Sequence, residues 1–130
     1  MSEKFKYVFD EETKILYKYY FGGISIDDIH SSWDYALANN LIPKETIGFI
    51  LDYTNANFNI KHSEYPRISE YYRKHLDVFG GHKIAIISQT PRDVVIPTLV
   101  QNEDLGYESR PFFTVDAAID WILGKLSRKS

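Results

Sequence analysis

The stretch that decides the fold is Ile47-Gly48-Phe49-Ile50-Leu51, which the acidic residue Asp52 follows directly. An unbroken apolar run of this length, bounded by turn residues, is typical of a strand that other elements cover on both faces. The stretch Lys83-Ile84-Ala85-Ile86-Ile87-Ser88 repeats the pattern. Two strands of this kind predict a mostly parallel sheet with helices packed on it.

Helices are predicted before and after the first buried strand. Ser25 and Asp28 form an acidic version of the capping box that opens a helix, and Asn39-Asn40 closes this helix. After the strand, the polar segment 54–62 is expected to be a loop. Apolar residues then recur at helical spacing until Gly80-Gly81, which predicts one amphipathic helix.

Two further helices are predicted after the second buried strand. Thr90-Pro91-Arg92-Asp93 has the N-cap, the first-turn proline and the acidic residue of a helix start. Pro97 should kink or interrupt this helix, which is expected over 94–103, because proline lacks the N–H group that a helix interior needs. Residues 110–113 predict a short strand, and Thr114 is the expected N-cap of the last helix.

The beginning of the chain predicts a β-hairpin. Side chains alternate in character over 5–9 and again over 15–21, with a polar turn at 10–14 between them, and Gly22-Gly23 ends the second strand. The element order is therefore β-β-α-β-α-β-α-β-α. It predicts an α/β fold with a mostly parallel five-stranded sheet, an N-terminal antiparallel hairpin and four helices.

The composition is that of one globular domain spanning 1–130. With 130 residues, of which 44% are hydrophobic and 25% charged, the chain suits a single core, and the absence of cysteine excludes disulfides and thiol chemistry. No secretory signal and no apolar run of roughly 18 residues is present, so we expect a cytoplasmic protein without a membrane span. The 15 basic residues are scattered among 18 acidic ones, which argues against nucleic-acid binding.

Four stretches of the chain carry a resemblance to a known superfamily. They are Phe21-Gly22-Gly23-Ile24-Ser25, Gly48-Phe49-Ile50-Leu51-Asp52, Lys83-Ile84-Ala85-Ile86-Ile87, and the ending Phe112-Phe113-Thr114-Val115-Asp116-Ala117-Ala118-Ile119-Asp120-Trp121-Ile122. In this arrangement the chain resembles the STAS (anti-sigma-factor-antagonist-like) superfamily. Within it, the chain resembles the SpoIIAA-like group, which is also compared with the CRAL-TRIO lipid-binding domains.

The resemblance implies a regulatory switch. In the best-known members, phosphorylation of a serine in an Asp-Ser-Ser-Gly-type motif after the middle strand switches binding to a partner kinase. The corresponding stretch of this chain, 52–66, lacks the motif. Ser63 and Thr54 are the candidate phosphoacceptors. Ser63 precedes the predicted second helix, where a phosphate would meet the positive end of the helix dipole, although it is alternatively a plain N-cap.

Polar residues after the two buried strands form a candidate binding rim. Ligands bind at the carboxyl ends of the strands in open α/β sheets, although Asp52 is alternatively only a cap of the following loop. The rim consists of Asp52, Tyr53, Asn55, Asn57, Ser88, Gln89, Thr90 and Arg92.

No pattern in the chain predicts a metal, a cofactor or a reaction. The four histidines lie in separate segments without the spacing that places two ligands on one helix face. Gly22-Gly23 and Gly80-Gly81 lack the spacing of phosphate-binding loops, and no Gly-x-Ser-x-Gly nucleophile motif is present. We therefore expect a protein without a cofactor or catalytic residues.

The leading hypothesis is a non-enzymatic regulatory or protein-interaction module, monomeric or weakly dimeric, that binds a protein partner through the region after the middle strand. The alternative is a carrier of a small apolar, lipid-like ligand enclosed by the helices and the aromatic hairpin residues Tyr17, Tyr19 and Phe21. An apolar pocket of several hundred Å³ would favour the alternative, and a filled core would count against it.

A basic and aromatic face around the second helix is a further hypothesis for a partner-binding surface, because Tyr and Arg are frequent anchors at interfaces. Charge clusters of this kind are otherwise ordinary solvated faces. The residues are Lys61, Arg67, Arg73, Lys74, Tyr65, Tyr71 and Tyr72.

Overall fold

The computed structural model describes residues 4–89 and 94–124. Within them, one sheet has the strand order β1-β2-β3-β4-β5, in which β1 runs antiparallel to β2 and the other neighbours are parallel. The strands are β1 (Phe5–Asp10), β2 (Ile15–Ile24), β3 (Gly48–Phe58), β4 (Lys83–Ile87) and β5 (Glu108–Phe112). The predicted α/β sheet with an antiparallel hairpin at one edge is therefore confirmed.

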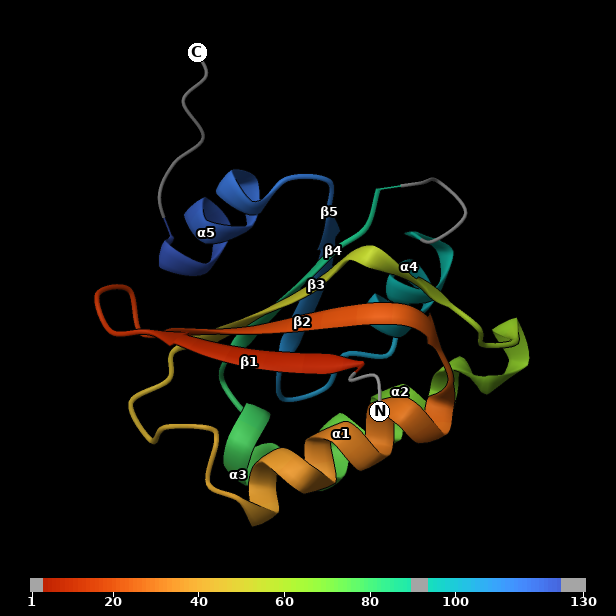
Figure 1. Cartoon of the computed structure of the whole chain (residues 1–130), viewed down its shortest axis with the longest axis horizontal. Coiled ribbons are helices and arrows are strands. Elements are labelled where there is room, and N and C mark those ends of the chain that lie inside the picture. The colour runs from red at the N-terminus through yellow and green to blue at the C-terminus, as the bar shows by residue number, and fades with distance from the viewer. Residues whose placement is uncertain (1–3, 90–93, 125–130) are drawn as a thin grey trace.

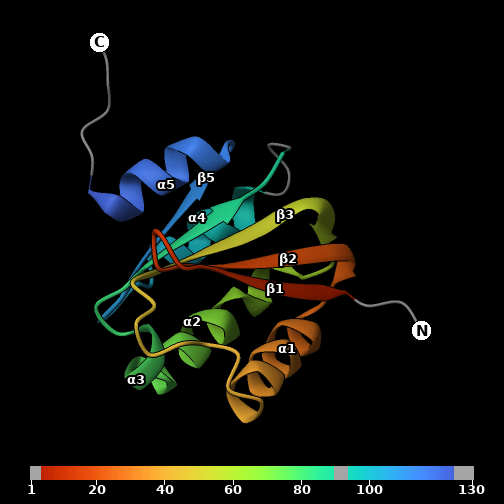
Figure 2. The same ribbon diagram turned by 60° about the vertical axis from the view of Figure 1, so that its left-hand side comes forward.

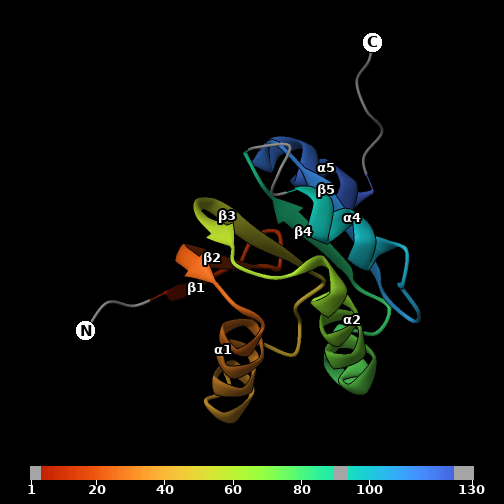
Figure 3. The same cartoon turned by 90° about the vertical axis from the view of Figure 1, so that its right-hand side faces the viewer.

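Helices cover the two faces of the sheet unequally (Figures 1 and 3). The helices are α1 (Ile26–Ala38), α2 (Tyr65–Lys74), α3 (Leu76–Phe79), α4 (Val95–Gln101) and α5 (Val115–Leu123), with a 3₁₀ turn η1 (His62–Glu64) before α2. The first four pack against one face and form the larger core, whereas α5 alone packs against the other. In the described part of the chain, no helix has the length and apolar character needed to cross a membrane.

Two of the predicted helix starts are confirmed by their caps. The Ser25 hydroxyl accepts a hydrogen bond from the Asp28 N–H at 3.1 Å, and the Asp28 carboxylate accepts one from the Ser25 N–H at 2.9 Å. This is the reciprocal capping box. The Thr114 hydroxyl accepts from the Ala117 N–H at 3.2 Å and caps α5.

The third strand is longer than its apolar run. The sequence predicts an end at Asp52 and a loop over 54–62, but β3 continues to Phe58. The reason is its neighbour β2, which is also long and pairs with β3 as far as Ile24 opposite Phe58, after an irregularity in register between Tyr19 and Phe21. The prediction of a loop is therefore wrong for residues 54–58, whose polar side chains are mostly exposed on a strand.

The second helix is divided. His75 has φ −122° and ψ 43°, which is not helical, and it separates α2 from the short α3. The described chain thus has five α-helices rather than the four predicted. Pro97 does not interrupt its helix, because α4 begins only at Val95 and the proline lies in the first turn, where no N–H is needed. The N-cap predicted at Thr90 lies outside the described residues.

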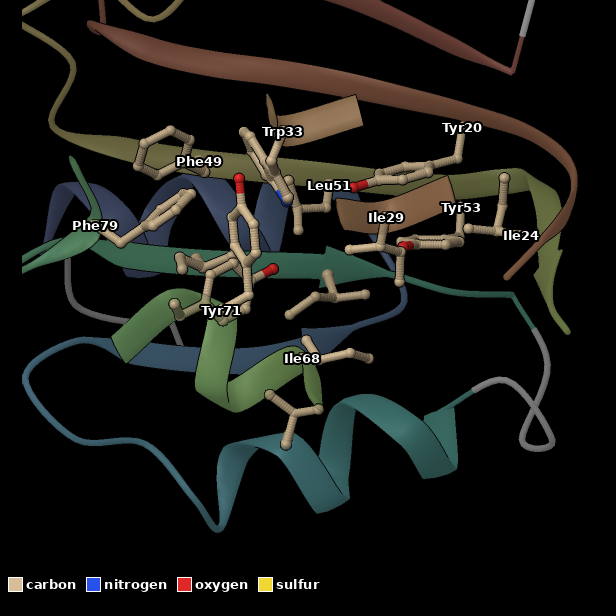
Figure 4. Packing of buried hydrophobic residues seen from close by; sticks show 14 of the residues in the cluster. Tyr20, Ile24, Ile29, Trp33, Phe49, Leu51, Tyr53, Ile68, Tyr71 and Phe79 are labelled. Atoms are coloured by element: carbon tan, nitrogen blue, oxygen red, sulfur yellow. The ribbon is translucent and has the colours of Figure 1, made fainter. Parts of the chain in front are cut away.

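Aromatic rings fill the larger core (Figure 4). The Trp33 side chain is fully buried and contacts Phe49 and Phe79 edge-on, with ring centroids 5.9 and 5.1 Å apart. Such edge-to-face pairs stabilise a core beyond the burial of their area. Between the helices and the sheet, a cavity of about 20 Å³ lies beside Tyr72 and Ile96, which is space for about one water molecule.

A lysine lies inside this core: Lys18, on β2, is 0% exposed. Its Nζ lies 3.8 Å from the ring centroid of Trp33 and 4.7 Å from that of Tyr20, and it donates a hydrogen bond to the Ser32 hydroxyl at 2.5 Å. The Tyr7 hydroxyl donates to the Ser32 carbonyl. Burial lowers the pKa of Lys18 well below its ordinary value, because the charged form loses its hydration.

We expect this lysine to make stability depend on pH. The unfolded chain, in which the pKa of Lys18 is ordinary, binds one more proton than the folded protein at any pH between the two pKa values. Below the ordinary lysine pKa of about 10.4, the free energy of unfolding should therefore rise with pH, with up to about 1.4 kcal/mol per pH unit from Lys18, and this contribution is lost as the pH falls toward the folded pKa.

Urea denaturation across this pH range measures the effect. Lys18→Met should remove the contribution of Lys18 to the slope, whereas Lys74→Met, at an exposed lysine of α2, should keep the wild-type slope. Equal slopes for wild type and Lys18→Met would show that Lys18 stays charged in the folded protein.

Candidate functional site

The carboxyl ends of β2 and β3 project beyond the rest of the sheet. The pairing of β3 with β4 ends at Asp52 opposite Ile87, whereas the pairing of β3 with β2 continues to Phe58. Residues 21–24 and 53–58 thus form a two-stranded extension, which we call the carboxyl-end ribbon (Figure 1). Tyr53, Asn55 and Asn57 of the predicted rim lie on it, and Asp52 directly precedes it.

The ribbon separates the rim residues by the alternation of its strands. Asn55 and Asn57 are exposed, and Asn55 lies opposite Phe21, whose side chain is 37% exposed. Tyr53 lies in the core instead, 3% exposed, with its ring stacked on that of Tyr20 at 4.0 Å. The side chain of Tyr53 is therefore not on the rim.

The second half of the rim follows β4. Ser88 is fully buried, and its hydroxyl has no hydrogen-bond partner among the described residues. Gln89 is exposed and donates to the Phe113 carbonyl at 3.1 Å, which ties the end of β4 to the end of β5. Thr90 and Arg92 lie outside the described residues.

Both candidate phosphoacceptors are exposed. Thr54 lies on the carboxyl-end ribbon, and its backbone N–H donates to the Asp52 carboxylate at 2.8 Å. Ser63 lies inside the 3₁₀ turn η1, and Glu64 directly precedes α2. Ser63 is therefore not the N-cap of α2, which was the alternative interpretation of this residue.

The basic face predicted around the second helix does not form as one surface. Tyr71 and Tyr72 are buried, 8% and 3% exposed. Arg67 lies 3.7 Å from the Asp27 carboxylate, and Arg73 donates to the Glu103 carbonyl at 3.1 Å. Tyr71 and Tyr72 are therefore not part of the predicted face, whereas Lys61, Arg67 and Lys74 are exposed and stay a predicted partner-binding surface.

Two histidines have a packing role that the sequence did not indicate. The rings of His30 and His75 both stack with the ring of Tyr71, with centroids 5.0 and 4.3 Å from it, and the Tyr71 hydroxyl donates to the Asp34 carboxylate at 2.7 Å. The described residues contain no group of three or more metal-ligating side chains placed to hold an ion.

A second surface lies on the α5 side of β1, β2 and β3, next to α5 (Figures 2 and 3). We call it the open face, and its residues are Lys6, Val8, Tyr17, Tyr19 and Asp52. The strand register places Lys6 beside Tyr19 and Tyr19 beside Asp52, so that a cation, an aromatic ring and an anion lie in one row across three strands. The rings of Tyr17 and Tyr19 are stacked, with centroids 6.2 Å apart. Sequence periodicity alone cannot find this row, because it depends on the register between strands.

The structure does not support the apolar-ligand alternative. The cavity under the helices holds about 20 Å³, and Tyr17 and Tyr19 lie on the face of the sheet away from α1. A larger depression of about 190 Å³ lies at the opposite end of the sheet, but it is open and has polar side chains, including those of Lys44, Asp77 and His82, in its lining. Neither hollow is an enclosed apolar pocket of several hundred Å³.

The row on the open face predicts that Asp52 influences the pKa of Tyr19. Burial and the neighbouring Asp52 carboxylate both raise the pKa of Tyr19, because both disfavour the phenolate. Asp52→Asn should therefore lower the pKa of Tyr19, as measured by NMR of ring-labelled tyrosine between about pH 9 and about pH 12. Asp116→Asn is the matched control, since Asp116 acts on Tyr17. An unchanged Tyr19 titration in Asp52→Asn would contradict the row.

Comparisons with known proteins agree on the architecture. No protein-family model matches the chain, and no curated protein does so by sequence. Among solved structures, an uncharacterised DUF3478-family protein with a SpoIIAA-like fold from Shewanella loihica PV-4 matches with a TM-score of 0.57 at 18% identity, over 94% of this chain and 98% of that one. The anti-sigma factor antagonist SpoIIAA in its unphosphorylated form matches with a TM-score of 0.52 at 14% identity, over 92% of this chain and 98% of that one. The chain therefore has the SpoIIAA-like, or STAS-like, fold.

Proposed function

We propose that this chain is a non-enzymatic regulatory module that binds a protein partner through the carboxyl-end ribbon. The observation that carries the proposal is the exposed ring of Phe21 on a strand pair whose other outward side chains include the amides of Asn55 and Asn57. An aromatic ring surrounded by hydrogen-bonding groups is typical of the anchors of protein interfaces.

The geometry of the ribbon suits a partner. Gly22 has φ 80°, a conformation that side chains other than glycine rarely adopt, and a Cβ built on it would meet no atom within 4 Å. No side chain therefore covers Gly22, whereas the Phe21 N–H and the Gly23 carbonyl on either side of it are already bonded to Lys4. A partner can approach closely at Gly22, beside the ring of Phe21.

The fold supports a regulatory role by analogy. SpoIIAA is named as an anti-sigma factor antagonist, and its matching structure is of the unphosphorylated form. In this chain, phosphorylation at Thr54 would add a charge of about −1.5 to −2 within the ribbon, beside the Asp52 carboxylate. Phosphorylation at Ser63 would place the charge in the turn before α2. Thr54 is the better candidate for a switch, because it lies on the proposed interface.

Affinity capture with matched variants tests the interface. Wild-type protein immobilised in an extract of its own cells should capture a partner. The control variant Leu105→Ser should capture the same partner, because Leu105 is 67% exposed and lies before β5, outside the ribbon. Phe21→Ser should lose it. With the partner then purified, calorimetry should show about a tenfold or greater loss of affinity for Phe21→Ser, as expected for an aromatic anchor. Equal affinities of the two variants would refute the proposed interface.

The switch is tested separately with the same partner. Thr54→Glu should weaken binding in calorimetry, since it adds an acidic group next to Asp52, whereas Thr98→Glu on an exposed site of α4 should not. Mass spectrometry of protein from its own cells should find phosphate on Thr54 or Ser63. Unmodified protein together with full binding by Thr54→Glu would contradict a phosphorylation switch and leave the interface itself untouched.

A further inference from the structure

The open face is sheet surface that the helices of the described chain leave largely uncovered; only Tyr17, at its border, packs partly against the core under α5. Helix α5 packs on β3, β4 and β5, and the other helices lie on the opposite face of the sheet (Figure 3). Val8 is 41% exposed there, although it lies in the middle of a strand next to Tyr17. A contiguous surface of aliphatic and aromatic side chains on a sheet usually indicates an interaction site.

The charges of this face are ordered and unpaired. Lys6, Tyr19 and Asp52 lie in register on β1, β2 and β3. Neighbouring strands are about 4.8 Å apart, so one charged residue lies on each side of the tyrosine at that spacing. Within the described residues, Lys6 forms no ion pair or hydrogen bond, and the Asp52 carboxylate accepts only from the Thr54 N–H. Both charges are thus available to a partner.

We propose that the open face binds the open face of a second copy of this chain. A row that reads cation, ring, anion is complementary to itself when it is turned around a two-fold axis that runs parallel to the strands above Tyr19. Each Lys6 then faces Asp52 of the other copy, and the two Tyr19 rings meet on the axis. An axis across the strands would place Lys6 against Lys6, so the charges select one of the two arrangements.

Helix α5 is compatible with this arrangement. Two sheets that pack face to face lie about 10 Å apart, which is also the height at which a helix packs on a sheet. In the proposed arrangement the hairpin of the second copy lies beside α5, which packs on β3, β4 and β5 of the first copy. In this position it covers Val8 and Tyr17 and brings each β1 edge next to the other copy's α5, which protects an edge strand that has no partner within the described chain.

The surface is distinct from the partner site proposed on the carboxyl-end ribbon, and its test is independent. Sedimentation equilibrium over a range of protein concentrations should show a reversible monomer–dimer equilibrium that weakens at high salt. Lys6→Glu should raise the dissociation constant about tenfold or more, because two attractive contacts become repulsive. Lys44→Glu, the same charge change at an exposed residue away from the open face, should leave it unchanged.

Mixing of charge variants gives the sharper result. Lys6→Glu and Asp52→Lys should each be monomeric alone, yet a mixture of the two should form heterodimers, since both contacts of the pair become attractive again. Circular dichroism establishes that each variant is folded; if Asp52→Lys is not, Asp52→Asn replaces it and should weaken the wild-type dimer. A monomer at all concentrations, or a dimer unaffected by Lys6→Glu, would overturn the proposal. Either outcome leaves capture through Phe21 unaffected.

Discussion

The burial of Lys18 is the constraint on which the rest of the structure depends. Its amine lies 3.8 Å from the centroid of Trp33 and bonds to Ser32, so one side chain of β2 holds helix α1 in place. A buried amine is costly unless aromatic faces and hydrogen bonds compensate it, and Tyr20 and Trp33 provide those faces. Because Lys18 points to the helices, strand alternation turns its neighbours Tyr17 and Tyr19 to the opposite face. The aromatic side chains of the open face are therefore a consequence of the orientation of Lys18.

Local signals in the sequence predicted much of the fold. The capping box at Ser25, the cap at Thr114 and the two buried apolar runs depend on residues close together, and each is confirmed. Which side chains of β2 face the helices could not be predicted in the same way. From the sequence, the set of side chains with Tyr17 and Tyr19 is expected to be buried and the set with Lys18 exposed. The structure has the opposite arrangement, because aromatic rings of β1 and α1 surround the Lys18 amine. The end of β3 was missed for a related reason, since Thr54 and its polar neighbours are typical of a loop unless a long partner strand is known.

The candidate site was predictable in its location but not in its detail. The carboxyl ends of the strands do bring Asn55 and Asn57 to an exposed edge, whereas Tyr53 in the same run faces the core. The row on the open face needs the register of three strands, which no local pattern specifies. Asp52 belongs to this row and also accepts the N–H of Thr54 on the carboxyl-end ribbon. The two surfaces are therefore adjacent at Asp52.

The central claim is that Lys18 orients the hairpin so that Lys6, Tyr19 and Asp52 form an outward, self-complementary surface. The most direct measurement is zero-length carbodiimide coupling in an equal mixture of unlabelled and ¹⁵N-labelled chains, followed by mass spectrometry of the linked peptides. An amide between Lys6 of one isotope and Asp52 of the other is the predicted product. Linked peptides in which Lys6 is joined only within one chain, or to other carboxylates of the second chain, would contradict the account.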